Sequence, residues 1–191
     1  MSNFVNIDKR QWTYLRELVM KNNSTTLKSA SYRITTAINK PRHVFTFIIN
    51  DASNNSFTAH KLLYYTFNVD DQEMARSYLE VGNGNEYPRV HYKPKDEQSR
   101  LFRDVMQYVH ANNEYDNDTL LNRINFNGIF SFIYFDLTNQ PMDIKDGLTQ
   151  LIFHYELSDT TANGYTVYAL ILHEQNVEIG NTDGKLLLRS M

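Results

Sequence analysis

Short runs of β-branched and aromatic residues follow one another through the last third of the chain. They are separated by turn-forming pairs such as Asn-Gly and Asp-Gly, at residues 146–147, 163–164, 180–181 and 183–184. Runs of this kind that are interrupted by such pairs are typical of antiparallel sheets. The pattern predicts five strands, at residues 129–135, 148–157, 165–172, 176–179 and 185–188.

The first two thirds of the chain mix strand and helix patterns. Apolar residues at helical spacing predict a helix over residues 8–20, and the stripe formed by Leu101, Val105 and Val109 predicts another over 96–110. A short helix is expected at 118–124. Further strands are expected at 31–37, 44–50, 61–69, 77–81 and 87–92, and Pro88 and Pro94 favour an edge or loop position for the last of these.

Composition narrows the classes of function. The chain has 191 residues, a net charge of −3 and no cysteine. We therefore expect one soluble domain, no disulfides, no thiolate metal site and no general attraction to nucleic acid. The sequence has no apolar run long enough for a membrane span and no signal-peptide core, so we expect no membrane association and an intracellular location during synthesis.

Candidate chemistry is sparse. The six histidines lack metal-ligand spacing, and the sequence contains no phosphate-binding glycine loop and no nucleophile elbow. We therefore predict no catalytic, cofactor-binding or metal-binding residues, no cofactor and no enzymatic activity. His154 and His173 are interpreted as structural histidines, although a meeting of the two across a sheet stays open.

One segment is rich in basic residues. It is Lys40-Pro41-Arg42-His43, which is preceded by Arg33 and flanked by the aromatic residues Tyr32 and Phe45. Such a segment can contact nucleic acid phosphates. A solvated turn between two strands is the preferred interpretation, so we expect nucleic acid contact to be minor at most.

Several motifs resemble a known family. Residues 31–45 (SYRITTAINKPRHVF) resemble the start of the second, C-terminal jelly roll of double-jelly-roll major-capsid-like proteins from Maverick/Polinton-type elements and adintoviruses. Later segments are similar to that family in the same order: 79–81 with 85–88, 132–136 with 137–140, and 169–174 (ALILHE) with 177–179. The resemblance runs from about Ser31 to the C-terminus.

The resemblance implies a mainly β fold, a jelly-roll antiparallel β-sandwich of two four-stranded sheets with helical insertions. Residues 1–28 are then expected to form an N-terminal helix or linker, and residues 29–191 a single jelly-roll domain. The family carries two rolls per chain and forms trimers that tile a shell. Because only one roll is expected here, the chain is interpreted as a fragment, a truncated product or one half of a capsid protein split over two chains.

The function implied by the resemblance is that of a structural capsid or capsid-derived protein located in the virion. Its expected partners are copies of itself, as a trimer or larger assembly, or a second jelly-roll chain or domain. The alternative is a non-enzymatic, carbohydrate-type ligand-binding jelly roll. In that case Tyr64, Tyr65, Tyr87 or Tyr92 would serve as stacking surfaces.

Overall fold

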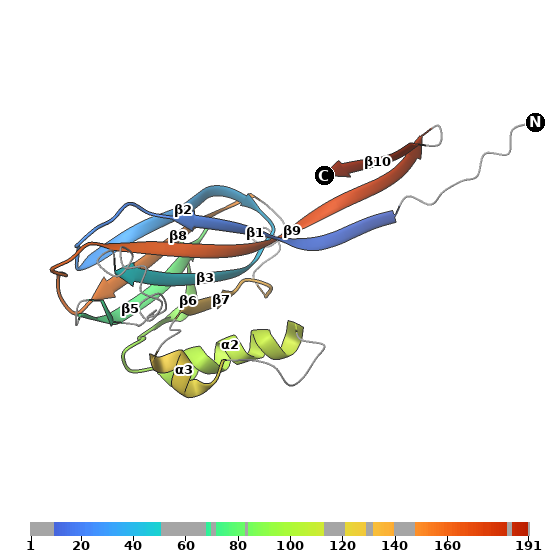
Figure 1. Cartoon of the computed structure of the whole chain (residues 1–191). Coiled ribbons are helices and arrows are strands. Elements are labelled where there is room, and N and C mark those ends of the chain that lie inside the picture. The colour runs from blue at the N-terminus through green and yellow to red at the C-terminus, as the bar shows by residue number, and fades with distance from the viewer. Residues whose placement is uncertain are drawn as a thin grey trace, which may run out of the picture.

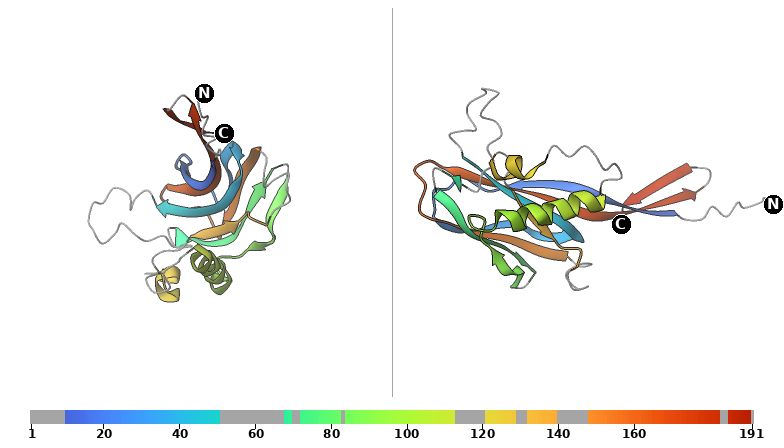
Figure 2. Two further views of the ribbon diagram at one scale, coloured as in Figure 1. Left: turned by 90° about the vertical axis from the view of Figure 1, so that its right-hand side faces the viewer. Right: turned by 90° about the horizontal axis from the view of Figure 1, so that it is seen from below.

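Two antiparallel β-sheets pack face to face in the computed structural model of the chain (Figures 1 and 2). The structure describes residues 10–50, 68–69, 72–82, 84–112, 121–128, 132–139, 148–182 and 185–190. The first sheet has the order β1-β9-β3-β7, with β10 also paired to β9. Its strands are β1 (Arg10–Lys21), β9 (Tyr165–Thr182), β3 (Pro41–Asn50), β7 (Ile133–Asp136) and β10 (Lys185–Ser190).

The second sheet has the order β2-β8-β5-β4, with β6 also paired to β5. Its strand β6 lies at an edge, as Pro88 predicted, because a proline cannot donate a hydrogen bond to a ladder. The strands are β2 (Ser29–Asn39), β8 (Leu148–Leu157), β5 (Gln72–Val81), β4 (Asn68–Val69) and β6 (Asn85–Tyr92).

Strand pairing is nested along the chain. β1 pairs with β9, β2 with β8, β3 with β7, and β5 with β6, all antiparallel. The chain is therefore one long antiparallel hairpin that wraps into two sheets, and the lateral pairs β3–β9 and β5–β8 close the wrap. This is jelly-roll connectivity, which confirms the predicted fold class. Each sheet has one strand more than the four that the resemblance implied, namely β10 and β4.

The predicted N-terminal helix is wrong. From Arg10 to Lys21 the chain is strand β1, which pairs with β9 from Arg10↔Ile179 to Lys21↔Tyr168. A short helix is marginal alone, whereas an edge strand satisfies its backbone groups on a long neighbouring strand. The β-forming run at residues 12–14 (WTY) is compatible with this outcome.

Long-range pairing also changed the limits of other strands. The predicted strands at 165–172 and 176–179 are one strand, β9, which includes the predicted turn at 180–181. The acidic break expected at residues 70–74 ends by Gln72, where β5 begins. The predicted strand at 61–69 lies outside the described residues apart from β4. Of the predicted strand at 129–135, residues 129–131 lie outside the described residues, and the rest is found in β7, which spans Ile133–Asp136.

The helices insert between β6 and β7, as predicted. α2 (Gln98–Asn112) matches the expected helix at 96–110. Residues 118–120 of the helix expected at 118–124 lie outside the described residues, and α3 spans Arg123–Gly128. α2 lies beside β7 at one edge of the sandwich, and α3 lies next to α2 (Figures 1 and 2). Leu101 and Val105 of α2 are fully buried, as their apolar stripe indicated.

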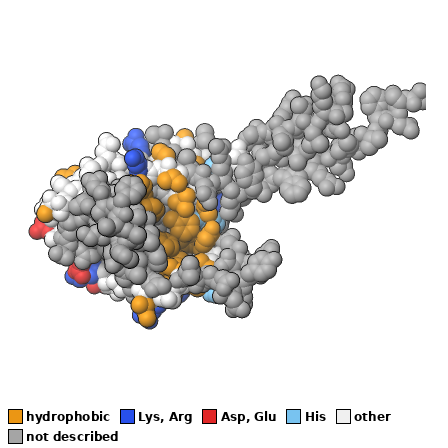
Figure 3. All heavy atoms as spheres, in the orientation of Figure 1, with side chains coloured by type: hydrophobic (Ala, Val, Ile, Leu, Met, Phe, Trp, Pro, Cys, Tyr) orange, Lys and Arg blue, Asp and Glu red, His pale blue; other side chains and the backbone are white. Residues whose placement is uncertain are grey.

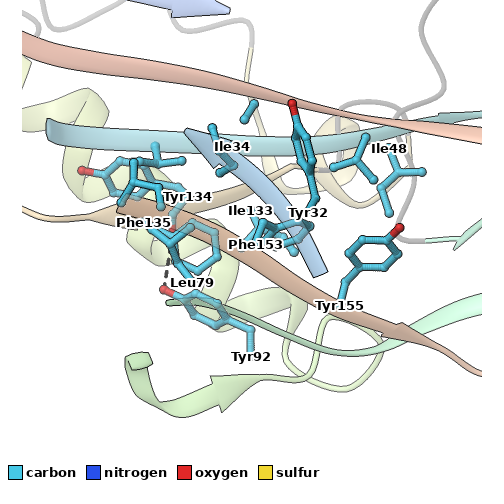
Figure 4. Packing of buried hydrophobic residues seen from close by; sticks show 14 of the residues in the cluster. Tyr32, Ile34, Ile48, Leu79, Tyr92, Ile133, Tyr134, Phe135, Phe153 and Tyr155 are labelled. Atoms are coloured by element: carbon cyan, nitrogen blue, oxygen red, sulfur yellow. Dashed lines mark hydrogen bonds between the residues drawn. The ribbon is translucent and has the colours of Figure 1, made fainter. Parts of the chain in front are cut away.

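The core lies between the two sheets and is rich in aromatic rings (Figure 4). Phe135 of β7 packs edge-on against Phe153 of β8, with 6.1 Å between ring centroids, so the two sheets meet through aromatic contacts. Each such side chain contributes about 1.5–3 kcal/mol of burial free energy. Alternate positions of β8, Leu151, Phe153, Tyr155 and Leu157, are buried, which is the expected period of a strand with one face on a core.

A ribbon of strands extends beyond the sandwich. It consists of the beginning of β1, the end of β9, and β10, and it projects away from the packed sheets (Figure 1). β9 is central in this ribbon, because β1 pairs with one of its edges and β10 with the other.

Candidate functional site

The basic segment is folded against β9. Lys40, at φ 47°, forms the tight turn between β2 and β3, and its carbonyl oxygen accepts a hydrogen bond of 2.9 Å from the Glu174 backbone N–H. Arg42 Nε donates to Glu174 Oε2 at 2.8 Å, Arg42 Nη2 binds the same oxygen, and Lys40 Nζ lies 3.7 Å from Glu174 Oε1. Arg42 is buried. One carboxylate thus compensates both cations, which favours the structural interpretation of this segment.

His43, the last residue of the segment, is buried between β3, β7 and α2. Its Nδ1 lies 2.9 Å from the Tyr134 hydroxyl, and its ring meets Tyr108 edge-on with centroids 4.8 Å apart. Burial lowers the pKa of His43, Asp136 at 4.0 Å opposes that shift, and Arg42 adds to it. The balance favours the neutral imidazole.

A pocket of about 580 Å³ opens beside His43, between α2 and the edge of the sandwich. Four tyrosines line it: Tyr87 and Tyr92 from β6, Tyr108 from α2, and Tyr134 from β7. Tyr92 donates from its hydroxyl to Asp104 Oδ2 at 2.9 Å and also lies 3.4 Å from the Tyr134 carbonyl oxygen, a contact drawn in Figure 4. The pocket therefore brings together two of the four tyrosines that the sequence singled out.

Burial is the main cause of the raised pKa values of Tyr87, Tyr92 and Tyr134. Asp104 adds to the shift of all three pKa values and Asp136 to those of Tyr87 and Tyr134, because a tyrosinate next to a carboxylate is disfavoured. The phenols are therefore neutral hydrogen-bonding groups at ordinary pH.

The positions of Tyr87 and Tyr92 do not fit the alternative in which tyrosines serve as open stacking surfaces for a carbohydrate. Tyr92 is only 3% exposed, and Tyr87 is half-buried, whereas a sugar ring needs an uncovered aromatic face. Tyr64 and Tyr65, the other two candidates, lie outside the described residues. Tyr108 and Tyr134 were missed by sequence reasoning, since only the approach of α2 to β7 brings them to this pocket.

A ladder of rings crosses the outer face of the second sheet. Tyr78 of β5 stacks on His91 of β6 at 4.0 Å and on His154 of β8 at 4.5 Å, with interplanar angles of 10° and 3°. Each histidine contacts a carboxylate: His91 Nε2 lies 2.7 Å from Glu86, and His154 Nε2 lies 3.0 Å from Glu80. The ladder joins three neighbouring strands.

Hydrogen bonds complete this ladder on both sides. Arg76 Nε donates to His91 Nδ1 at 2.8 Å, and the Ser31 hydroxyl lies 2.8 Å from His154 Nδ1. His154 therefore has partners at both ring nitrogens, in agreement with its interpretation as a structural histidine. His173 lies in β9 of the other sheet, so the two histidines are not brought together.

The outer face of the first sheet is apolar where α2 does not lie over it. Phe47 of β3 and Tyr168 of β9 stack in parallel with centroids 5.4 Å apart, and Leu170 follows next on the same face of β9. Val19 of β1 is the register partner of Leu170 and is 62% exposed. We call Val19, Phe47, Tyr168 and Leu170 the apolar patch. Figure 3 shows hydrophobic side chains gathered on this face.

No group of three or more histidine, aspartate or glutamate side chains among the described residues is arranged to hold a metal ion. No helix in the described part of the chain is long and apolar enough to cross a membrane.

Comparison with known proteins gives structural likeness only. No protein-family model matches the chain, and no curated protein matches it either. Its structure is similar to a chain of the Sputnik virophage determined by cryo-EM, with a TM-score of 0.52 and 12% identity, over 97% of this chain and 40% of that chain. At this identity the likeness shows the fold, and this chain spans less than half of the Sputnik chain.

Two further solved structures are similar at lower TM-scores. One is the PBCV-1 virus capsid, with a TM-score of 0.44 and 11% identity over 94% of this chain and 52% of that chain. The other is the mavirus major capsid protein, with a TM-score of 0.42 and 10% identity over 95% of this chain and 41% of that chain.

Proposed function

We propose that this protein is a structural capsid or capsid-derived protein that assembles through contacts between jelly rolls and catalyses no reaction. The observation that carries the proposal is the nested jelly-roll pairing, which has a structural counterpart in a Sputnik virophage chain over 97% of this chain. On this proposal its place is the virion, and it assembles inside the cell that makes it.

The partner is a second jelly roll. Because this chain spans 40% of the Sputnik chain, a partner roll on the same or another polypeptide supplies what the longer protein contains. We further propose the second C-terminal roll of the Maverick/Polinton and adintovirus family as the counterpart of this chain, on the strength of the motifs at residues 31–45 and 169–179. The trimer is the expected assembly, with nucleic acid contact minor.

The apolar patch is the surface proposed for these contacts. Phe and Tyr side chains are enriched in the centres of protein interfaces, and obligate interfaces bury ~2,000 Å² or more of largely apolar surface. Val19 stands on an edge strand beside Leu170, so a neighbour seated on the first sheet would cover both.

Light scattering with negative-stain microscopy on the purified chain tests the proposal. Trimers, rings or shells are the expected result, and a clean monomer at high concentration would contradict self-assembly by this chain. Val19→Glu places a charge in the apolar patch and should shift the assembly toward monomer. Val90→Glu is the matched control, because Val90 is 70% exposed on β6 of the second sheet and should leave the assembly unchanged.

A further inference from the structure

The tyrosine-lined pocket has the size of a small-ligand site. Its volume of about 580 Å³ lies within the range of small-molecule pockets, and residues of β3, β6, β7 and α2 contribute to its walls. Three of its polar residues, His43, Tyr92 and Tyr134, are more than nine-tenths buried, so their positions are set by the surrounding packing. The proposed capsid role uses none of these groups.

The charged residues that line the pocket are acidic. Asp104 and Asp136 line it, and the described lining residues include no lysine or arginine. Arg103 contacts Asp104 Oδ1 at 3.0 Å, but its side chain is 66% exposed, so solvent weakens this pair. His43 next to Asp136 is buried and is held toward its neutral form. Arg100 lies over the Tyr92 ring with its Cζ 4.7 Å from the ring centroid, and its charge is paired with Glu97 at 2.9 Å. The described lining residues of the pocket therefore carry a net negative charge.

Asp136 is the carboxylate best placed to receive a ligand. Its Oδ1 accepts hydrogen bonds from the Thr138 backbone N–H at 2.9 Å and from the Thr138 hydroxyl at 2.6 Å. These bonds fix the orientation of the whole carboxylate, including its second oxygen, at the end of β7. Gln107 and Asn139 add side-chain carbonyl oxygens to the lining.

The complementary ligand carries positive charge and several N–H donors. An anion would be repelled by two carboxylates, and a compact metal ion requires a cluster of ligands that the described residues do not form. A planar guanidinium or a primary ammonium can donate to separate oxygens and lie against tyrosine rings. We propose that this pocket binds an organic cation of the guanidinium or primary-ammonium class, with Asp136 as its counter-charge.

Calorimetric titration of the full chain tests this proposal with a matched pair of probes. Ethylguanidinium and ethylurea have nearly the same shape, and only the first is charged. Saturable binding of ethylguanidinium, at least about tenfold tighter than that of ethylurea, is expected. Equal binding of the two probes, or no binding of either, would overturn the proposal.

A substitution locates the site. Asp136→Asn keeps an acceptor oxygen for Thr138 and removes the charge, so we expect about a tenfold loss of ethylguanidinium affinity with the thermal midpoint nearly unchanged. Asp159→Asn is the matched control. Asp159 is exposed in the turn after β8, and its Oδ1 likewise accepts from a backbone N–H, that of Thr160, at 2.7 Å. Equal losses in the two variants would overturn the assignment to this pocket.

The same probe distinguishes two sources of the natural cation. If the bound group is an arginine or lysine side chain of a second copy, ethylguanidinium competes with it and lowers the oligomer mass measured by light scattering. If the group belongs to a free small molecule, binding occurs with the oligomer mass unchanged. Binding at the pocket is measured independently of assembly, so failure of the capsid proposal leaves this test intact.

Discussion

Arg42 and Glu174, which lie 132 residues apart in the sequence, form a largely buried ion pair that ties the start of β3 to β9. Arg42 donates to one carboxylate oxygen of Glu174, and Lys40 approaches the other. The pair fixes the turn at Lys40 against the long central strand of the first sheet. It also explains why the most basic segment of the sequence presents little uncompensated charge.

Removing the carboxylate of this pair should destabilise the fold. Glu174→Gln replaces charge-assisted hydrogen bonds with weaker ones in a setting with little solvent, so we expect the free energy of unfolding to fall by about 1–3 kcal/mol. Urea denaturation measures the change. Arg103→Ala, which removes a mostly exposed ion pair with Asp104, should cost less than about 1 kcal/mol. A loss in Glu174→Gln no larger than in this control would contradict the prediction.

Stability should fall with acid because of His43. Burial lowers the pKa of His43 in the folded protein below its ordinary value of 6.5. Below pH 6.5 the unfolded chain therefore binds a proton that the folded chain resists, and the free energy of unfolding decreases by up to about 1.4 kcal/mol per pH unit until the folded pKa is reached. Above pH 7.5 this contribution is fully present.

Urea denaturation between pH 7.5 and pH 5 measures this effect. His43→Gln has no titratable group at this position, so its stability should depend less steeply on pH than that of the unchanged protein. The difference between the two slopes isolates His43 from the carboxylates that titrate in both proteins. Parallel slopes would show that His43 titrates alike in the folded and unfolded states.

The aromatic ring of Tyr78, at the centre of the ladder on the second sheet, should stabilise the fold through stacking on both of its faces. Tyr78→Ala removes stacking on His91 and His154 and the contact with Arg76, whose guanidinium lies 5.3 Å from the ring centroid. We expect a loss of about 1–2 kcal/mol in the free energy of unfolding. Tyr78→Phe keeps the ring and should stay within about 0.5 kcal/mol. Equal losses in both variants would assign the effect to the hydroxyl instead.

Local sequence patterns correctly predicted those elements whose own residues show that they form a helix or a strand. The apolar stripe predicted α2, and the run of β-branched and aromatic residues between turn-forming pairs predicted β8, and both elements were found close to the expected positions. Short motifs in a fixed order also pointed to the jelly roll. The helix and the strands follow from local patterns, because each element must bury one face, whereas the jelly roll was implied only by the family resemblance.

Segment 10–21 shows the limit of such patterns. The apolar spacing of this segment fits a helix. However, one edge of β9 lies beside the whole of segment 10–21, and the backbone of the segment pairs with β9 instead. The same β9 continues through the turn signal at 180–181 because β10 pairs with it there, with Leu187 opposite Gly180 and Leu186 opposite Asn181. Hydrogen bonds to distant strands outweigh local propensity in both places.

The sequence by itself therefore determined the fold class, the main helix and most strands, as well as the expectation of a structural protein. Only the tertiary structure decided that β1 is a strand, that Glu174 compensates Lys40 and Arg42, and that Tyr87 and Tyr92 meet Tyr108, Tyr134 and two aspartates around one pocket. The physical reason is distance along the chain. Charge pairing, burial and cavity shape depend on which remote segments the sheets bring together, and no local pattern contains that information.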